Sequence, residues 1–340
     1  MNYKEKYEKI LKMKEDNTEE LLCKSSKLKE LLNEISKNNK EEDLINKIKY
    51  EILMLRNKCT YKENYNIDII LKDLEIEPII NKIKDENSLI EFSKLLDIFS
   101  GMIYGKDQLD VILKEKIKHS TIISSKEQIL DSHFRVVAVL DNISNEDIFL
   151  KNKNYNDHLI YILSECLLSL SVVLNIVINS YVVRHKDKIE LDLREILKDS
   201  AFIKPENFES YIKMFCLYLI DNDIETALQK CIPLLENSLK YICEINGISP
   251  YRLKNSKNDL EKTIDETNMF GYILNNLLKD IIPEDIVFNL LALFDSVIGF
   301  NIRNNISHGL WDSDDYDTTI NHYALFFILF LCCRLKKVNT

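Results

Sequence analysis

The stretch IETALQKCIPLLENSLKYICEING, residues 224–247, decides the fold class of this chain. Its apolar residues recur at helical spacing among Lys and Glu, and Gly247 stands where such a helix would end. Pro233 lies in the middle of the pattern, so we expect the helix to kink or divide there. A similar pattern over residues 207–220 predicts a neighbouring helix of the same kind.

Further helices are predicted downstream. One begins after Pro283, with acids in its first turn, and ends near Gly299. Asn301 is placed to cap a short helix that Gly309 terminates. The last helix starts in an acid-rich turn and ends in bases, which suits the helix macrodipole. Residues 205–340 therefore predict a compact helical bundle.

The composition extends this expectation to the whole chain. Only 6 glycines and 5 prolines occur in 340 residues, which argues against an all-β fold and against a glycine-rich phosphate loop. Lys204-Pro205 marks a plausible boundary, because the proline precedes a new amphipathic pattern. We therefore predict an all-α protein, with a helical N-terminal region over residues 1–204 and a helical domain over residues 205–340.

The first 60 residues predict two or three charged amphipathic helices. They hold 14 Lys and Arg and 12 Asp and Glu, so the charges nearly cancel. A helical hairpin or short coiled coil fits this pattern and offers a surface for a protein partner. Residues 133–140 are rich in β-branched side chains, but one isolated run cannot build a sheet and stays unassigned. The apolar positions at 3- and 4-residue spacing are Leu21, Leu22, Leu28, Leu31, Leu32, Leu44, Ile45, Ile48, Ile52 and Leu55.

Charge and cysteine usage exclude several classes of protein. The formal net charge of -10 excludes a general nucleic-acid coat protein, so RNA binding requires a local basic patch. None of the 8 cysteines forms a Cys-x-x-Cys pair or a cluster with zinc-ligand spacing. We expect reduced thiols, no metal and no cofactor in a cytoplasmic protein.

Residues 158–183 are apolar and long enough to cross a membrane. Glu165, Asn175 and Asn179 interrupt the run, and an acid in the middle of a bilayer is costly. We therefore expect a buried core helix here and no contact with a membrane.

The segment NIRNNISHGL, residues 301–310, contains the candidate catalytic residues. RNA cleavage by the internal 2'-hydroxyl needs a group that exchanges a proton near neutral pH, and His308 supplies one. It also needs a cation for the phosphate charge, which Arg303 supplies, while Asn304 can orient either group. Arg303 lies about 140° from His308 around an ideal helix. This separation favours a composite site at a symmetric dimer interface. The alternative is an exposed arginine and a histidine that caps the last carbonyls.

Arg303-Asn304-x-x-x-His308 resembles the R-x(4–6)-H signature of the HEPN superfamily. A longer pattern resembles an uncharacterised bacterial family with a HEPN-like C-terminal domain. One part of this pattern lies on an earlier helix, and the other part surrounds the Arg-His motif. Lys240 stands where that pattern favours Arg, which keeps the charge but loses the planar fork. The resemblance covers residues 205–340. Its matching positions are Pro233, Glu236, Leu239, Lys240, Gly299, Asn301, Arg303, Asn304, His308, Gly309 and Leu310.

The resemblance implies a helical bundle that dimerises and brings two Arg-His motifs into one cleft. It implies metal-free RNA cleavage that leaves 2',3'-cyclic phosphate and 5'-hydroxyl ends. Many members act in phage defence, toxin–antitoxin pairs or RNA stress responses, and others have no known nuclease activity. Glu236 is a supporting candidate that would orient Arg303 or His308; alternatively it is a solvated acid or pairs with Lys240.

For other residues of this domain the sequence gives weaker evidence of a functional role. Arg252, Lys254 and Lys257 form a compact basic cluster that would guide RNA, unless they are a solvated loop. Trp311 would stack on a base or pack beneath the motif.

Four aspartates, at positions 312, 314, 315 and 317, lack the glycine and distal glutamate of a calcium loop. N-capping of the last helix explains them better. Residues 204–340 hold 13 Lys and Arg against 19 Asp and Glu, so RNA would need a cleft that concentrates cations.

Two functions stay open at this point. The first is a homodimeric endoribonuclease, in which His308 is the general acid or base, Arg303 the phosphate clamp and Asn304 the orienting group. The second is a non-catalytic helical dimerisation or interaction module, such as a regulator or a defence-system subunit.

Overall fold

A computed structural model of the chain contains two compact units. Unit 1 is formed within residues 1–65 and 128–139, and unit 2 within residues 66–127 and 140–340. The predicted boundary at Lys204-Pro205 therefore falls inside unit 2, where α10 (Ile189–Leu197) and α11 (Phe208–Cys216) pack together across it. The structure describes residues 3–14, 76–119, 127–130, 136–256, 259–267, 269–311, 313–316 and 318–335, and scattered positions between 23 and 51.

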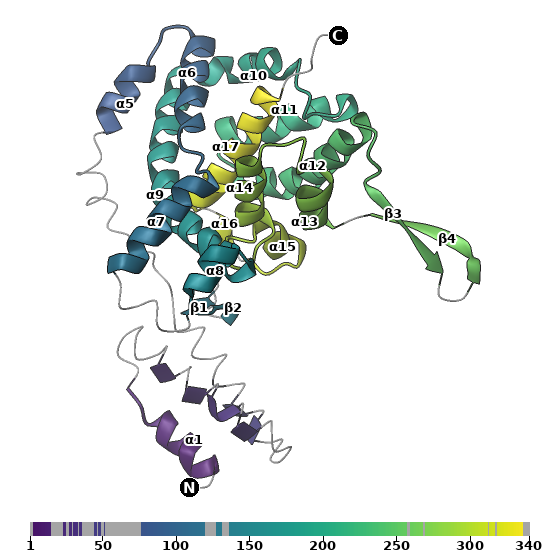
Figure 1. Cartoon of the computed structure of the whole chain (residues 1–340). Coiled ribbons are helices and arrows are strands. Elements are labelled where there is room, and N and C mark those ends of the chain that lie inside the picture. Colours follow the sequence, from purple (N-terminus) through teal and green to yellow (C-terminus); the bar gives the residue numbers. More distant parts are fainter. Residues whose placement is uncertain are drawn as a thin grey trace. The chain divides into compact units, whose positions relative to one another are not determined.

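Unit 2 is a helical bundle, so the predicted all-α fold is confirmed (Figure 1). Its other longer helices are α5 (Ile76–Ile83), α6 (Ser88–Ser100), α7 (Lys106–His119), α9 (Lys153–His185), α12 (Ile224–Ile245), α14 (Glu284–Phe294) and α17 (Thr319–Arg334). Its shorter helices are α8 (Asn145–Leu150), α13 (Phe270–Tyr272), α15 (Ile302–Ser307) and α16 (Ser313–Tyr316). The described part of unit 2 also contains 3-10 turns at Lys186–Lys188 and Pro205–Asn207 and π-helical turns at Leu217–Asp221 and Ile273–Leu277.

The helices α17 and α9 form the centre of unit 2. Every residue of α17 from Ile320 to Cys333 is buried, as expected for a helix that is apolar on all sides. The α9 helix packs against α17 and also against α5, α6, α7 and α14. Phe92 of α6 joins them by packing against Tyr181 of α9 and Phe326 of α17, and Phe99 packs against four rings of α17. These contacts make one continuous core.

The apolar run at residues 158–183 lies within α9. Among the described residues, α9 with its continuation to Leu197 is the one helical stretch that is long and apolar enough to cross a membrane. Its inner face is buried along its whole length, from Tyr155 to His185. Glu165, on its outer face, pairs with Lys116 of α7. The buried side of α9 thus contributes to the core of unit 2, and 39% of its most apolar window is buried.

The helices predicted over residues 207–220 and 224–246 correspond to α11 with its π-helical turn and to α12. The α12 helix runs through Pro233 without dividing. Pro233 is exposed, whereas the inner face of α12 is buried along its length, including Leu228 and Leu235. Burial of that face offsets the roughly 3 kcal/mol that proline costs inside a helix.

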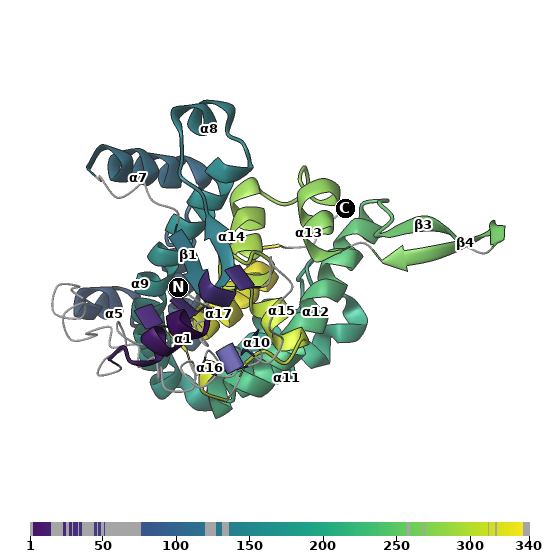
Figure 2. The same cartoon turned by 90° about the horizontal axis from the view of Figure 1, so that it is seen from below.

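In the described part of the chain two pairs of strands accompany the helices, and the sequence predicted neither pair. β1 (Glu127–Leu130) pairs with β2 (Val136–Leu140), so the unassigned run at 133–140 supplies a strand that has a partner. β3 (Tyr251–Ser256) pairs antiparallel with β4 (Asp259–Thr267) where a polar loop was expected. Figure 1 and Figure 2 both show this second hairpin extending away from the helices of unit 2.

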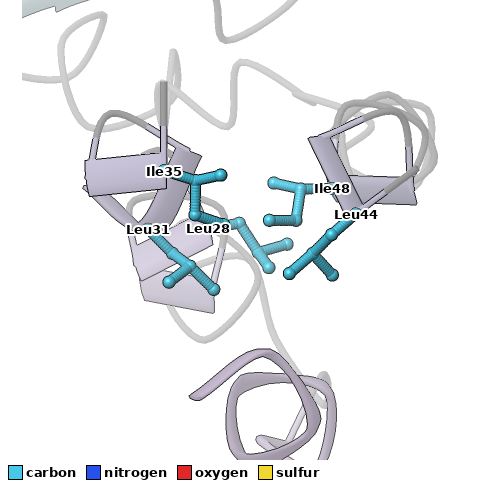
Figure 3. Close-up of a cluster of buried hydrophobic side chains, with 5 residues drawn as sticks. All are labelled: Leu28, Leu31, Ile35, Leu44 and Ile48. Atoms are coloured by element: carbon cyan, nitrogen blue, oxygen red, sulfur yellow. The ribbon is translucent and has the colours of Figure 1, made fainter. Parts of the chain in front are cut away.

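Unit 1 contains α1 (Tyr3–Leu11) and a small apolar cluster. All described positions between 23 and 51 are helical, in agreement with the predicted helices there. Lys24, which is buried, donates from Nζ to the carbonyl of Leu11 at 2.7 Å and so ties this segment to α1. The predicted apolar positions 21, 22, 52 and 55 lie outside the described residues. Figure 3 shows the cluster side chains directed toward one another; they are Leu28, Leu31, Ile35, Leu44 and Ile48.

Candidate functional site

A tight approach of backbone to backbone positions the segment that carries the Arg-His motif. The N–H of Phe300 donates to the carbonyl of Ala292 in α14 at 2.9 Å. A Cβ atom on Gly299 would collide with that same carbonyl, so only glycine fits. Asn301 follows in the left-handed conformation, with φ of 51°, and α15 starts at the next residue. This glycine fixes the place from which α15 leaves α14.

Arg303 is held by two side chains. Its Nε donates to Oε1 of Glu236 in α12 at 2.8 Å, and its Nη1 donates to Oδ1 of Asn304 at 2.7 Å. Asn304 in turn donates from Nδ2 to Oδ1 of Asn301 at 2.6 Å. The predicted cap by the Asn301 side chain is wrong, because that side chain makes no hydrogen bond to the helix backbone and binds Asn304 instead.

Glu236 and Arg303 are 67 residues apart in the sequence, and the bond between them joins α12 to α15. Both side chains are 29% exposed, so water screens the pair only in part. The structure thus brings together four of the predicted positions in one hydrogen-bonded chain: Glu236, Arg303, Asn304 and Asn301.

A second acid, Asp295, belongs to this cluster and was not predicted. Burial raises the pKa of Asp295, and repulsion from Glu236 raises it further against the attraction of Arg303. Its carboxylate lies against Gly271 of α13, where a Cβ atom would collide with it. Nothing in the local sequence around Asp295 signals this position, because it depends on how α12, α13 and α14 meet.

His308 ends α15 at the C-cap position. Its backbone N–H donates to the carbonyl of Asn304 at 3.0 Å, and Gly309 follows with φ of 59°, as predicted for a glycine that terminates a helix. Its imidazole is exposed and has no hydrogen-bond partner in the described part of the chain. The ring therefore does not cap the last carbonyls of α15, which was the alternative role expected for it.

The neighbouring candidates divide into those near the motif and those on the hairpin. Lys240, one turn after Glu236 in α12, is half-buried and forms no ion pair with it among the described residues. Trp311 is half-buried and packs edge-on against Tyr316, with ring centroids 5.3 Å apart. Tyr316 thus occupies one edge of the indole.

The predicted basic cluster is not a loop. Arg252 and Lys254 are residues of β3, at register positions opposite Glu266 and Ile264 of β4. Lys257 lies outside the described residues. The backbone of this segment is therefore a strand in an extended hairpin, with an acid opposite one of its bases.

Neither of the two described aspartates stands at the N-cap of the last helix. Asp314 and Asp315 belong to α16, the N-cap of α17 is Thr318, and its side chain makes no capping hydrogen bond. Asn321 instead joins α16 to α17 by donating to the carbonyls of Asp315 and Tyr316 at 2.9 and 3.0 Å. The other two aspartates lie outside the described residues. In the part that is described, no three His, Cys, Asp or Glu side chains are placed to hold a metal ion.

The site thus combines an exposed imidazole with a guanidinium held in place by its neighbours. Nη2 of Arg303 makes no hydrogen bond to the described residues, so one edge of the guanidinium remains available to an anion. Glu236 and Asp295 offset its positive charge within one chain. No family model, curated protein or solved structure matched this chain.

Proposed function

We propose that this protein is a cytoplasmic, metal-independent endoribonuclease of the HEPN type, with His308 as general acid or base and Arg303 as phosphate clamp. One observation carries the proposal: the His308 ring is exposed and unengaged, while Arg303 on the same helix is held by Glu236 and Asn304. A guanidinium whose direction is fixed loses less entropy when it binds phosphate. A role in phage defence or a toxin-like system follows from the family resemblance.

In this proposal, phosphate binding requires a second copy of the chain, because acids balance the charge of Arg303 within one protomer. Within one protomer, Glu236 and Asp295 surround Arg303, and an acidic setting repels phosphate. A symmetric dimer with two such motifs facing one cleft would double the guanidinium and imidazole groups at the scissile phosphate. It would also allow His308 of one protomer to act with the Arg303 of the other.

The second function is a non-catalytic dimerisation or interaction module. A separate observation favours it, since the bond between Glu236 and Arg303 fixes α15 on α12 and needs no substrate to explain it. In that case the motif maintains a surface, and the helices of unit 1 bind a partner protein.

Cleavage of mixed RNA in EDTA tests the proposal. Wild type should leave 2',3'-cyclic phosphate ends, and His308→Ala should cleave about 10²–10⁴-fold more slowly because it removes the proton-transfer group. Arg303→Lys keeps the charge but loses the fork, and should also be impaired. Ser307→Ala is the matched control, because Ser307 is the exposed neighbour of His308.

Equal cleavage by wild type and His308→Ala would mean that the site is not at His308. Intact RNA with both proteins, together with a dimer that Arg303→Ala dissociates, would establish the interaction module in place of the nuclease. The dimer is measured by light scattering at the protein concentration of the cleavage assay.

A further inference from the structure

A cavity of about 570 Å³ lies in unit 2, away from the Arg-His motif in sequence. Two segments line it: the loop between α5 and α6, and the turn at which α9 ends. The lining residues are Lys84, Asp85, Glu86, Arg184, His185, Asp187 and Lys188. Cavities of a few hundred Å³ hold small-molecule ligands.

A buried carboxylate organises the wall of this cavity. Glu91, in the first turn of α6, is fully buried, and it accepts hydrogen bonds from Arg184 Nη2, from His185 Nε2 at 3.0 Å and from the N–H of Asp85 at 2.9 Å. Burial alone would raise the pKa of Glu91, but these hydrogen bonds outweigh it and hold the pKa below its usual value. The ionised Glu91 therefore fixes Arg184 and His185 in the wall.

The wall contains one buried donor that has no protein partner. Nε of Arg184 is buried and has no hydrogen-bond acceptor in the described structure, although Nη1 and Nη2 bind Ser180 and Glu91. A buried donor left unpaired costs about 1–3 kcal/mol, which the charge-assisted bond of Arg184 to Glu91 and its bond to Ser180 offset. The His185 side chain is 7% exposed, and its Nε2 is engaged by Glu91, so Arg184 is the cationic group that the wall presents.

The rim adds two free cations. Lys84 and Lys188 are exposed and make no ion pair within the described residues. Of the three acids in the lining, Asp85 is already paired with Lys94 at 3.0 Å. Glu86 and Asp187 are exposed at the rim, where carboxylates accept hydrogen bonds from hydroxyl groups.

We propose that this cavity binds a small phosphate-bearing ligand, with its phosphate against Arg184 and between Lys84 and Lys188. Phosphate oxygens are acceptors, which matches the guanidinium of Arg184 and the ammonium groups of Lys84 and Lys188. The rim acids suit a ligand whose remaining part carries hydroxyls, such as a nucleoside monophosphate. This site is independent of the nuclease proposal.

Calorimetric titration of the full chain with AMP, inorganic phosphate and adenosine tests this assignment. AMP should bind with a Kd below about 1 mM, phosphate should compete with it, and adenosine should not bind. Tighter binding of AMP than of phosphate would identify an organic phosphate as the ligand class, and the reverse order would identify free phosphate.

A matched pair of double variants locates the binding. Lys84→Ala with Lys188→Ala should weaken AMP binding by at least about tenfold, because two charge-assisted contacts are lost. Lys82→Ala with Lys186→Ala changes the net charge equally, at two exposed lysines that do not line the cavity, and should leave the affinity unchanged. Equal loss in both pairs, adenosine binding as tight as that of AMP, or no saturation by either phosphate would each overturn the proposal.

Discussion

Replacing Glu91 by glutamine tests how unit 2 keeps a charged carboxylate in its core. Glu91 accepts three hydrogen bonds, from Arg184, His185 and the backbone of Asp85. Hydrogen bonds to a charged group contribute about 1.5–3 kcal/mol each, and a glutamine amide places a donor where one acceptor was. The Arg184 side chain is 25% exposed, so water can replace part of its interaction with Glu91, which reduces the loss of stability. We expect the free energy of unfolding of unit 2 to fall by about 2–4 kcal/mol.

Thermal unfolding followed by circular dichroism at pH 7 measures this loss. A change of this size should lower the Tm by roughly 5–10 °C for a unit of this length. Glu86→Gln removes the same charge from an exposed position five residues earlier, and its Tm should stay within about 2 °C of wild type. Equal Tm values for the two variants would refute the reasoning, because a solvated Glu91 would contribute as little as Glu86.

The pH dependence gives the sign of the effect. The folded pKa of Glu91 lies below the ordinary value of 4.5, so the ionised carboxylate stabilises the fold fully above that pH. This stabilisation is lost as the pH falls through the folded pKa. The difference in Tm between wild type and Glu91→Gln should therefore be widest near neutral pH and narrow below about pH 4. A difference that widens in acid would mean that Glu91 is protonated in the folded protein.

Two further substitutions probe the packing of unit 2. Gly299→Ala should lower the free energy of unfolding by about 1–3 kcal/mol, because its methyl group would meet the carbonyl of Ala292, whereas Gly101→Ala has only an ordinary contact to make and should be neutral in the same melt. Tyr323→Phe removes a buried hydroxyl that has no partner among the described residues, and should raise the free energy of unfolding by about 1 kcal/mol; a lower Tm would contradict this.

The long helices were predictable because their apolar period is continuous. The inner face of α12 repeats from Ile224 to Cys243, and both ends were placed within about a residue. The effect of Pro233 was not predictable, since it depends on how much of that face the rest of unit 2 buries. The β3–β4 hairpin escaped notice because its strands are polar and its turn lacks the Asn-Gly signal.

The candidate site was predictable only where a motif carries it. Glu236 came from the family resemblance, and nothing in the spacing of 67 residues pairs it with Arg303. Asp295 and the cavity at Arg184 had no motif, since each is assembled by helices that are distant in sequence. Buried acids such as Glu91 look in sequence like any solvated acid on a charged helix.

The central position of α17 governs when unit 2 acquires its core. The ribosome releases α9 about 130 residues before α17, and at about 5–20 residues per second this leaves α9 without its main partner for roughly ten seconds. During that interval α9 can pack against α5, α6 and α7, but the face that α17 covers stays exposed. The core of unit 2 is therefore completed only after translation of residues 319–334, and until then the exposed face of α9 makes the chain prone to aggregation.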